Sequence, residues 1–456
     1  MKTEALHTVY FLGIGGIGMS ALARYLNAAG VKVHGYDKTP TSLTSLLEAE
    51  GMKIHYDDRP DLIPDDTDLI VYTPAIPADL AEFRKASSGS FSMIKRSALL
   101  GEITDSKHTL AVAGTHGKTT VSSLLAHIMH SSAQGCTAFL GGIAKNYNSN
   151  LLLMPESKFM VAEADEFDRS FLKLNPQSAV ITSVDADHLD IYKTHENLKA
   201  SFTEFSEKIR ENGQLVIKLG LDLNLKTKPG VKIYRYAMSG EADFAALNLR
   251  MIDGQYHYDI KTPGGIITGI KPALPGLFNI ENSIGAAALS WLNGATEEEI
   301  RNGINSFTGV KRRFDHRVVS KNAVYIDDYA HHPEELKACI KSVRDLYPGR
   351  HITGIFQPHL YTRTRDFSDG FAESLSMLDR VILLDIYPAR ELPVEGVSSA
   401  MLLDKITLND KQLCPKTGVL DLISRLKPDL LLTLGAGDID QLADPITALM
   451  NRNEEK

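Results

Sequence analysis

The sequence is poor in cysteine, in excess positive charge and in long apolar runs. Its three cysteines, Cys136, Cys339 and Cys414, lie far apart without a CxxC pair, which argues against a disulfide framework or a zinc cluster. Lysine and arginine number 49 against 57 aspartates and glutamates, a formal net charge of −8, so duplex nucleic acid is not expected as the main partner. No stretch approaches the roughly 18–20 apolar residues of a membrane span, and no secretory signal pattern is present. We therefore expect a cytoplasmic protein that binds neither nucleic acid nor membrane.

The composition is that of a packed globular protein, with 43% hydrophobic and 23% charged residues in a chain of 456. At about 100–200 residues per domain, this length predicts about three domains. Short β-branched runs alternate with segments of helical period, which predicts an α/β fold with mostly parallel sheets. We place the domains at 1–106, 107–313 and 314–456, with an antiparallel insertion at about 231–270. The expected strands include 9–12, 31–36, 69–73, 110–113, 159–162, 179–184, 323–326, 352–356, 381–384 and 430–434.

The first glycine-rich turn, GIGGIG at 13–18, lies between the expected strand 9–12 and an expected helix at 19–29. Gly13, Gly15 and Gly18 satisfy GxGxxG, and Asp37 follows about 20 residues further on, where an acidic residue would hold a ribose. Glycine lets the backbone approach a pyrophosphate, and the helix N-terminus faces the negative charge. Because this chemistry demands only a diphosphate, a nicotinamide cofactor and a nucleotide sugar both fit, and a tight turn without a ligand is the third reading.

The second glycine-rich turn, AGTHGKTT at 113–120, also lies between a strand and a helix. Its amides are expected to wrap phosphate, with Lys118 reaching the outer phosphates and the Thr119 hydroxyl binding Mg²⁺. The loop is shorter than the common GxxxxGK[ST] form, because its first glycine is Gly114. A nucleoside triphosphate is therefore the expected ligand.

Acidic residues follow two of the expected strands. EADE at 163–166 follows 159–162, and DADHLD at 185–190 follows 179–184. Because sites of α/β proteins lie at the carboxyl ends of strands and Mg²⁺ prefers oxygen ligands, Glu163 is a candidate metal ligand. His188 could complete that site together with Thr119.

Further polar motifs occur towards the C-terminus. FNIEN at 278–282 opens a helix, where Asn279 could cap the helix or read an adenine edge. Arg313, in the linker SFTGVKRRFD, could reach a γ-phosphate. DDYAHHP at 327–333 lies between a strand and a helix, and Arg363 in QPHLYTR could bind a carboxylate through two hydrogen bonds.

Taken in order, these motifs resemble the ATP-dependent Mur ligases over nearly the whole chain, from GIGGIGMS through Lys95-Arg96, AGTHGKTT, EADE, DADHLD, FNIEN, GVKRRFD, DDYAHHP and FQPHLYTRT to GAGDI. The resemblance implies an N-terminal Rossmann-like domain for a UDP-sugar, a central phosphate-loop ATPase domain with a parallel sheet, and a C-terminal Rossmann-like domain for an amino acid. It implies that L-alanine is added to the lactyl carboxylate of UDP-N-acetylmuramate through an acyl phosphate, with ATP as co-substrate and Mg²⁺ as cofactor. This reaction belongs to peptidoglycan precursor synthesis, and a monomer or homodimer is expected.

The resemblance also implies roles for individual residues. The residues implied to bind the UDP-sugar are Gly13, Gly15, Gly16, Gly18, Asp37 and Arg96. Those implied to bind ATP are Gly114, Thr115, His116, Gly117, Lys118, Thr119, Thr120, Asn279, Arg313, Asp328 and Tyr329. The implied metal ligands are Thr119, Glu163 and His188, the alanine-binding residues are His332, His359 and Arg363, and the catalytic residues are Lys118, His188, Arg313 and His332. Leu360 stands where the family often has arginine, which removes one cation from the expected alanine site.

Three alternative functions fit part of the sequence. A ligase of the same family that attaches a recycled tripeptide shares the first two domains, and FQPHLYTRT in the third favours addition of a single amino acid. An NAD-dependent oxidoreductase explains GxGxxG but leaves GTHGKTT, EADE and DADH without a purpose. A phosphate-loop switch or motor leaves the diphosphate fingerprint of the first domain unexplained.

Overall fold

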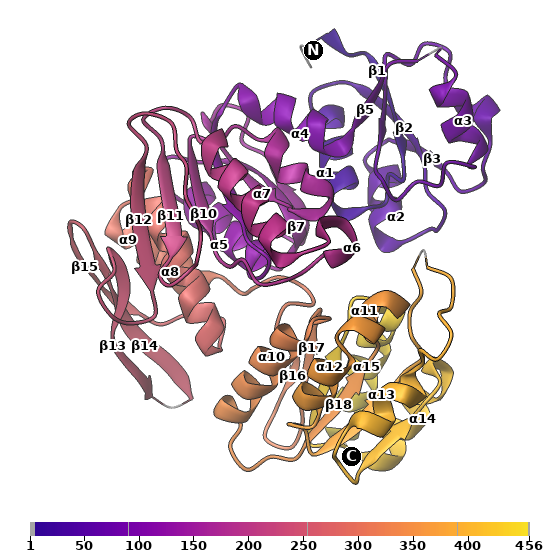
Figure 1. Ribbon diagram of the computed structural model, residues 1–456, viewed down its shortest axis with the longest axis vertical. Helices are drawn as coiled ribbons and strands as arrows, with labels where there is room; N and C mark the ends of the chain where they lie inside the picture. Colours follow the sequence, from indigo (N-terminus) through magenta and orange to yellow (C-terminus); the bar gives the residue numbers. More distant parts are fainter. Residues whose placement is uncertain (1–4, 90, 253, 390, 455–456) are drawn as a thin grey trace. The chain divides into compact units, whose positions relative to one another are not determined.

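The computed structural model describes residues 5–89, 91–252, 254–389 and 391–454 (Figure 1). They form three sheets with helices packed on them, in two compact units. The first unit extends to Leu274 and resumes over Asn279–Thr308, and the second comprises Pro275–Phe278 and the chain from Gly309 onwards. In the part of the chain that is described, no helix is long and apolar enough to cross a membrane.

The first sheet is parallel, with strand order β3-β2-β1-β4-β5. Every residue of β1 is buried, because helices cover both faces of such a sheet. The order reverses at β1, where the chain turns into α1, and this switch point is where doubly wound folds bind ligands. The strands are β1 (Thr8–Leu12), β2 (Lys32–Tyr36), β3 (Lys53–His55), β4 (Leu69–Tyr72) and β5 (Met93–Lys95), and the helices are α1 (Ile17–Ala28), α2 (Ser42–Ala49), the short 3₁₀ helix η2 (Pro60–Leu62), α3 (Ala81–Ser87) and α4 (Arg96–Asp105).

The second sheet has ten strands in the order β15-β14-β13-β12-β11-β10-β6-β9-β7-β8. The strands are β6 (His108–Ala113), β7 (Thr137–Ala144), β8 (Ser149–Leu152), β9 (Phe159–Ala164), β10 (Ser178–Ile181), β11 (Gln214–Lys218), β12 (Lys232–Ala237), β13 (Phe244–Ile252), β14 (Gln255–Thr262) and β15 (Gly265–Ile270). The accompanying helices are α5 (Lys118–Ser131), η3 (Phe167–Lys173), α6 (Leu189–Tyr192), α7 (His195–Lys208), α8 (Leu277–Leu292) and α9 (Glu297–Ser306). Helix α8 begins at Leu277, so the expected helix at FNIEN is confirmed, and Thr296 caps α9 in a capping box with Glu299.

The predicted antiparallel insertion is partly wrong. Strand β12 pairs parallel with β11, and the antiparallel pairs begin only at β13–β14. The first four residues of β12 are exposed or half-buried, so its polar character reflects incomplete covering by helices. Sequence alternation indicates one-sided burial, and it does not distinguish parallel from antiparallel pairing.

The third sheet has the order β16-β17-β21-β18-β19-β20, with β16 antiparallel and the other strands parallel. Its strands are β16 (Asp315–Val319), β17 (Val324–Asp328), β18 (Ile352–Phe356), β19 (Arg380–Leu383), β20 (Lys411–Leu413) and β21 (Leu430–Leu434). The helices are α10 (Pro333–Leu346), α11 (Tyr361–Asp366), α12 (Ser368–Leu375), α13 (Ser399–Lys405), η4 (Lys416–Gly418), α14 (Val419–Leu426), η5 (Asp438–Leu442) and α15 (Ala443–Glu454). Together the three sheets confirm the predicted α/β class with three domains.

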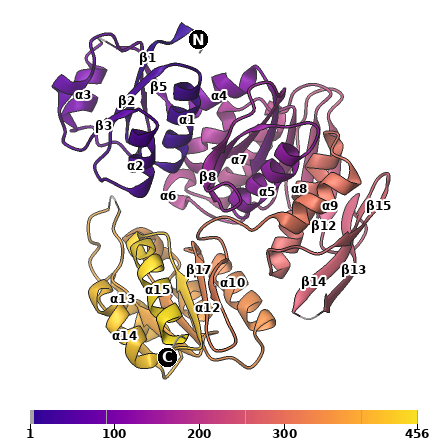
Figure 2. The ribbon, with the colours of Figure 1, turned by 180° about the vertical axis from the view of Figure 1, so that it is seen from behind.

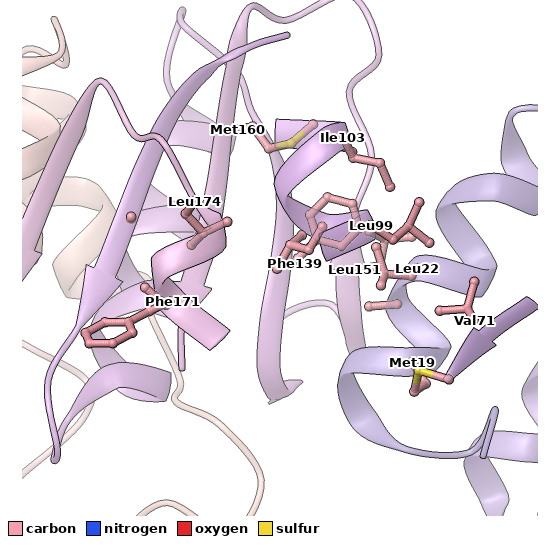
Figure 3. Packing of buried hydrophobic residues seen from close by; sticks show 14 of the residues in the cluster. Met19, Leu22, Val71, Leu99, Ile103, Phe139, Leu151, Met160, Phe171 and Leu174 are labelled. Atoms are coloured by element: carbon pink, nitrogen blue, oxygen red, sulfur yellow. The ribbon is translucent and has the colours of Figure 1, made fainter. Parts of the chain in front are cut away.

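One hydrophobic cluster joins the first two sheets. Leu22 of α1 and Leu99 of α4 belong to the same cluster as Phe139 of β7 and Leu151 of β8 (Figure 3). Figure 2 shows α1 beside β8, where Arg24 Nη1 donates to Ser149 Oγ at 2.8 Å. The turn that begins α1 is therefore held in a defined position against the second sheet.

A buried histidine ties the helix that follows the second glycine-rich turn to two other segments. His127 of α5 forms hydrogen bonds with the Tyr147 hydroxyl (2.8 Å) and the Ser306 hydroxyl (2.9 Å). The neighbouring Asn146 side chain donates to the Ser306 carbonyl at 2.9 Å and accepts from the Thr308 amide at 2.9 Å. Burial, together with the charge of His130, lowers the pKa of His127 to about 4. The folded protein thus holds this histidine in its neutral form.

The buried neutral histidine predicts a pH-dependent stability. Because the pKa is about 4 in the folded state and about 6.5 in the unfolded chain, the folded state binds fewer protons. This contribution is fully present above about pH 6.5 and is lost as the pH falls towards 4. Between pH 7 and pH 5, we expect the free energy of unfolding of the wild type to fall by about 2 kcal/mol more than that of His127→Gln.

Urea titrations followed by the fluorescence of Trp291, the single tryptophan of the chain, report on the first unit. The variant His7→Gln replaces an exposed histidine of the same unit and is the matched control. Parallel stability curves for the wild type and His127→Gln from pH 5 to pH 7 would contradict the expectation.

Candidate active site

The first glycine-rich turn is built around two close approaches. The Gly15 amide donates to Asp37 Oδ2 at 2.8 Å, and a Cβ at Gly15 would lie 2.8 Å from that oxygen. A Cβ at Gly18 would lie 2.8 Å from Arg96 Nη1. Gly13 has a φ of +81°, and Gly16 is the N-cap of α1. The structure thus brings all the predicted UDP-sugar residues together at the start of α1.

The second glycine-rich turn is held by two hydroxyl side chains that follow β10. Gly114 has a φ of +141°, and a Cβ there would lie 2.0 Å from Thr182 Oγ1, so only glycine fits. Ser183 Oγ accepts from the His116 amide at 2.7 Å and lies 3.0 Å from Thr115 Oγ1. The sequence analysis did not single out Thr182 and Ser183, although ITSV directly precedes the acidic motif.

The phosphate-loop lysine, Lys118, forms hydrogen bonds with other residues of the protein. Lys118 Nζ donates to Glu166 Oε1 at 2.8 Å and to the Gly114 carbonyl at 2.7 Å. The Glu166 side chain is fully buried, and burial raises its pKa. Burial alone would lower the pKa of Lys118, but the Glu166, Asp165 and Glu163 carboxylates outweigh it and the pKa is raised. Lys118 therefore stays charged. Glu166 is a site residue that the sequence analysis missed, although it lies within EADE.

The candidate metal ligands come from α5, from the end of β9 and from the segment between β10 and α6. Thr119 and Thr120 are buried in the first turn of α5. Glu163 ends β9, and a Cβ at Gly141 would lie 2.3 Å from its Oε2, so glycine makes room for this carboxylate. His188 lies with Nε2 3.7 Å from Glu166 Oε1. In the described ranges, no three His, Cys, Asp or Glu side chains form a metal site by themselves. The Thr119 hydroxyl and phosphate oxygens would have to complete the coordination, which is how proteins commonly bind Mg²⁺.

A pocket extends from the first glycine-rich turn to the end of β9. Its volume is about 270 Å³. Gly16, Gly18 and Arg96 line it, together with Glu163 and Asp165. The candidate diphosphate site and the candidate metal carboxylate therefore share one space within the first unit.

FNIEN contributes two asparagines. Asn279 is buried near the start of α8, and its Oδ1 accepts from Asn282 Nδ2 at 3.4 Å. A Cβ at Gly117 would lie only 2.7 Å from Asn282 Oδ1, so Asn282 lies against the phosphate loop. The sequence analysis named only Asn279. The helical spacing of three residues places both side chains on one face of the helix.

In the second unit, Arg313 and Tyr329 lie together. The guanidinium carbon of Arg313 is 4.8 Å from the centre of the Tyr329 ring. The Asp328 carboxylate accepts from the Phe314 amide at 2.6 Å and the Ala330 amide at 2.7 Å, and burial raises its pKa to about 6. The structure brings these three predicted ATP-side residues together.

The predicted alanine-side residues lie on different segments of the second unit. His332 is the N-cap of α10, 5% exposed, with its ring 4.8 Å from that of Phe367. Its neighbour His331 instead faces His359, with ring centres 6.2 Å apart. The DDYAHHP motif contains both histidines, of which only His332 was predicted as a site residue.

Arg363 lies on α11, which begins directly after Leu360. The backbone of Leu360 has a φ of +69°, and its amide donates to the Tyr387 carbonyl at 2.9 Å. The His359 ring stacks on Tyr387, with ring centres 5.7 Å apart. The backbone at 359–360, which leads into α11, is thus held against Tyr387.

Three α/β domains with a diphosphate turn and a phosphate loop define a nucleotide-dependent enzyme. Three domain families match in order along the chain: the Mur ligase family, catalytic domain, at residues 8–108, the Mur ligase middle domain at 112–290, and the Mur ligase, glutamate ligase domain, at 312–437. The chain belongs to the Mur ligase family of ATP-dependent ligases.

Individual relatives are similar over their full length. The UDP-N-acetylmuramate–L-alanine ligase of Parabacteroides distasonis is 50% identical, and the alignment covers 100% of each chain. The enzyme of the same name from Porphyromonas gingivalis is 51% identical over 96% of this chain and 98% of its own. Among solved structures, the UDP-N-acetylmuramate-alanine ligase of Thermotoga maritima has a TM-score of 0.83 at 24% identity, covering 98% of this chain and 100% of that one. At this identity, the structural likeness shows the fold.

The geometry of the phosphate loop predicts the effect of removing its lysine. In Lys118→Ala, the positive charge that should face the outer phosphates is lost, so we expect the rate of phosphate release from ATP to fall by about 1000-fold or more. Release is measured by a phosphate assay under the conditions of wild-type turnover. Lys199→Ala removes a lysine of α7 that pairs with the exposed Asp222 and should leave the rate unchanged. A near-normal rate in Lys118→Ala would refute the phosphate-loop assignment.

Proposed function

We propose that the protein joins L-alanine to the lactyl carboxylate of UDP-N-acetylmuramate, giving UDP-N-acetylmuramoyl-L-alanine, ADP and phosphate in peptidoglycan precursor synthesis. The observation that carries this proposal is the pocket shared by the diphosphate turn and the Glu163 carboxylate. A sugar attached to a diphosphate at Gly16–Gly18 would extend through this pocket towards the nucleotide phosphates. Full-length relatives of about 50% identity that bear the name of this reaction support it.

The reaction requires a poor acyl donor to be activated. The lactyl carboxylate attacks the γ-phosphorus of ATP to form an acyl phosphate, and the alanine amine then displaces phosphate to form the amide. Lys118 and Arg313 stabilise the negative charge that develops on the transferred phosphoryl group. Thr119, Glu163 and His188 would hold Mg²⁺, which neutralises phosphate charge when it is bound. The positions of these donors around the phosphate loop fit that role.

We also propose contacts for the adenosine part of ATP. Asn279 and Tyr329 are proposed to contact adenine, and Asp328 is proposed to contact the ribose.

The proposed domain boundaries are 1–106, 107–313 and 314–456. The proposed location is the cytoplasm, which supplies both nucleotides. All three cysteines are buried free thiols, in keeping with a reducing compartment.

For alanine, we propose that Arg363 binds the carboxylate and that His359 lines the site. His332 is proposed to act by fixing the start of α10, where its ring is buried. His331, which faces His359, joins the proposed site. These residues carry the discrimination between a single amino acid and the tripeptide used by related ligases.

One assay tests the proposed function and its rivals. Phosphate release is measured with UDP-N-acetylmuramate, ATP and Mg²⁺, with either L-alanine or a murein tripeptide as acceptor. We expect release to require the UDP-sugar and to proceed with L-alanine. Release with the tripeptide alone would identify the recycling ligase, and release without any UDP-sugar would favour a switch or motor. Reduction of a nicotinamide cofactor in place of ATP turnover would identify an oxidoreductase.

The alanine site predicts a selective kinetic effect. In Arg363→Ala, a carboxylate loses a charge-assisted pair of hydrogen bonds, so we expect the KM for L-alanine to rise by about 10- to 100-fold, while the KM for ATP stays unchanged. Arg365→Ala, on the same helix, is the matched control, because the Arg365 guanidinium pairs with its neighbour Asp366. An unchanged alanine KM in Arg363→Ala would remove this residue from the site.

A further inference from the structure

Two consecutive carboxylates bind cations that belong to two different substrate sites. Glu166 binds Lys118 of the phosphate loop, with oxygen–nitrogen distances of 2.8 and 2.7 Å. Asp165 Oδ2 lies 3.5 Å from Nη2 of Arg96, which lies against the diphosphate turn at Gly18. Both carboxylates follow β9 directly, within three residues of Glu163.

The Glu166 carboxylate and a phosphate would use the same donors of Lys118. An ammonium group has three hydrogens, and Lys118 Nζ already has three acceptors: Glu166 Oε1 at 2.8 Å and the carbonyls of Gly114 at 2.7 Å and Thr115 at 3.5 Å. The 2.8 Å hydrogen bond to Glu166 Oε1, on a fully buried carboxylate, is a charge-assisted bond of the strong kind. To bind an outer phosphate with its full charge, Lys118 has to give up Glu166.

The Arg96–Asp165 pair presents the same competition at the other site. The pair lines the pocket shared by the diphosphate turn and Glu163. The side chains of Arg96 and Asp165 are 23% and 35% exposed, and their charged atoms are 3.5 Å apart. Because the pair is partly solvated and longer, it is weaker than the Lys118–Glu166 pair. A diphosphate at Gly18 would draw the guanidinium away from Asp165.

The carboxylates are anchored through their own backbone. The Asp165 carbonyl accepts from the Phe171 amide at 2.8 Å, and the Glu166 carbonyl accepts from the Tyr192 hydroxyl at 2.6 Å. The long side chains of Lys118 and Arg96 can change rotamer more easily than this turn can move. In each pair, we therefore expect the cation to change position when a phosphate binds.

We propose that Asp165 and Glu166 are positioning residues that compete with substrate phosphates for Arg96 and Lys118, and so set the affinities of the UDP-sugar site and the nucleotide site independently. The proposal rests on the function proposed above. It assigns a role to the two acidic residues of EADE that are not candidate metal ligands. Its distinctive consequence is that removing either carboxylate charge tightens binding at one site.

The nucleotide arm of the test uses ADP without Mg²⁺, in the presence of a chelator, by isothermal titration calorimetry. In Glu166→Gln, the amide keeps the shape and one acceptor but loses the charge, so we expect ADP to bind about tenfold more tightly than to the wild type. Asp168→Asn removes one charge from the same turn, where Asp168 pairs with Lys95, and should leave ADP binding unchanged. Unchanged or weaker ADP binding by folded Glu166→Gln would overturn the role of Glu166.

The UDP-sugar arm uses UDP-N-acetylmuramate. In Asp165→Asn, we expect this ligand to bind about threefold more tightly and ADP to bind as before, because the pair is partly exposed. Glu166→Gln should show the opposite selectivity. A change of both affinities in both variants would indicate only a general electrostatic effect and would overturn the proposal. A residue with a merely structural role would weaken binding and would not tighten it.

A measurement on the wild type covers the case in which a variant does not fold. In a crystal structure with bound ADP, Lys118 Nζ should contact a phosphate oxygen and lie beyond hydrogen-bond distance of Glu166. A lysine that contacts both groups at once would overturn the proposal. If the wild type binds ADP but not UDP-N-acetylmuramate, the proposed function fails, while the Glu166 arm still decides this inference. If the wild type binds both and neither variant tightens, the inference fails and the function stands.

Discussion

The site in the first unit depends on one hydrophobic core that spans two sheets. Leu22 and Leu99 come from helices of the first sheet, and Phe139 and Leu151 come from strands of the second. Burying each such side chain stabilises the folded state by about 1.5–3 kcal/mol, so separating the two sheets would cost several times that free energy. This core holds the diphosphate turn at a set distance from the end of β9. In the proposed reaction, a carboxylate on one nucleotide attacks a phosphate of another, so both must be held in fixed positions. A misplacement of reacting groups by about 1 Å can lower the rate about 100-fold.

Anion binding in this molecule depends on individual neighbouring groups and not on the net charge. The formal net charge is −8, yet every proposed substrate carries an anionic group. Backbone amides of the two glycine-rich turns and a few cations would bind these anions, and carboxylates bind two of the cations, Lys118 and Arg96. Pairing keeps Lys118 charged despite its burial. Through the same pairing, Asp165 and Glu166 are proposed to set the affinities for the substrate phosphates. The net charge of the chain could not indicate this.

Most of the regular structure could be predicted from the sequence, because short-range patterns encode it. The glycine-rich turns lie between a strand and a helix as expected, and α8 begins at the FNIEN motif as expected. The direction of β12 could not be predicted, since alternation reports burial and not the direction of the neighbouring strand. The roles of Thr182 and Ser183 could not be predicted either, because their contacts with the phosphate loop arise only where β10 lies beside β6.

The sequence by itself determined the fold class, the order of the domains and the position of both glycine-rich turns between a strand and a helix, since these follow from residue types at fixed spacing along the chain. Only the tertiary structure decided which side chains meet. It showed that His331 faces His359 while His332 caps a helix, that Asn282 lies against Gly117, and that Glu166 binds Lys118. Such contacts depend on the packing of helices and sheets that are distant in sequence, and one-dimensional spacing carries no information about that packing.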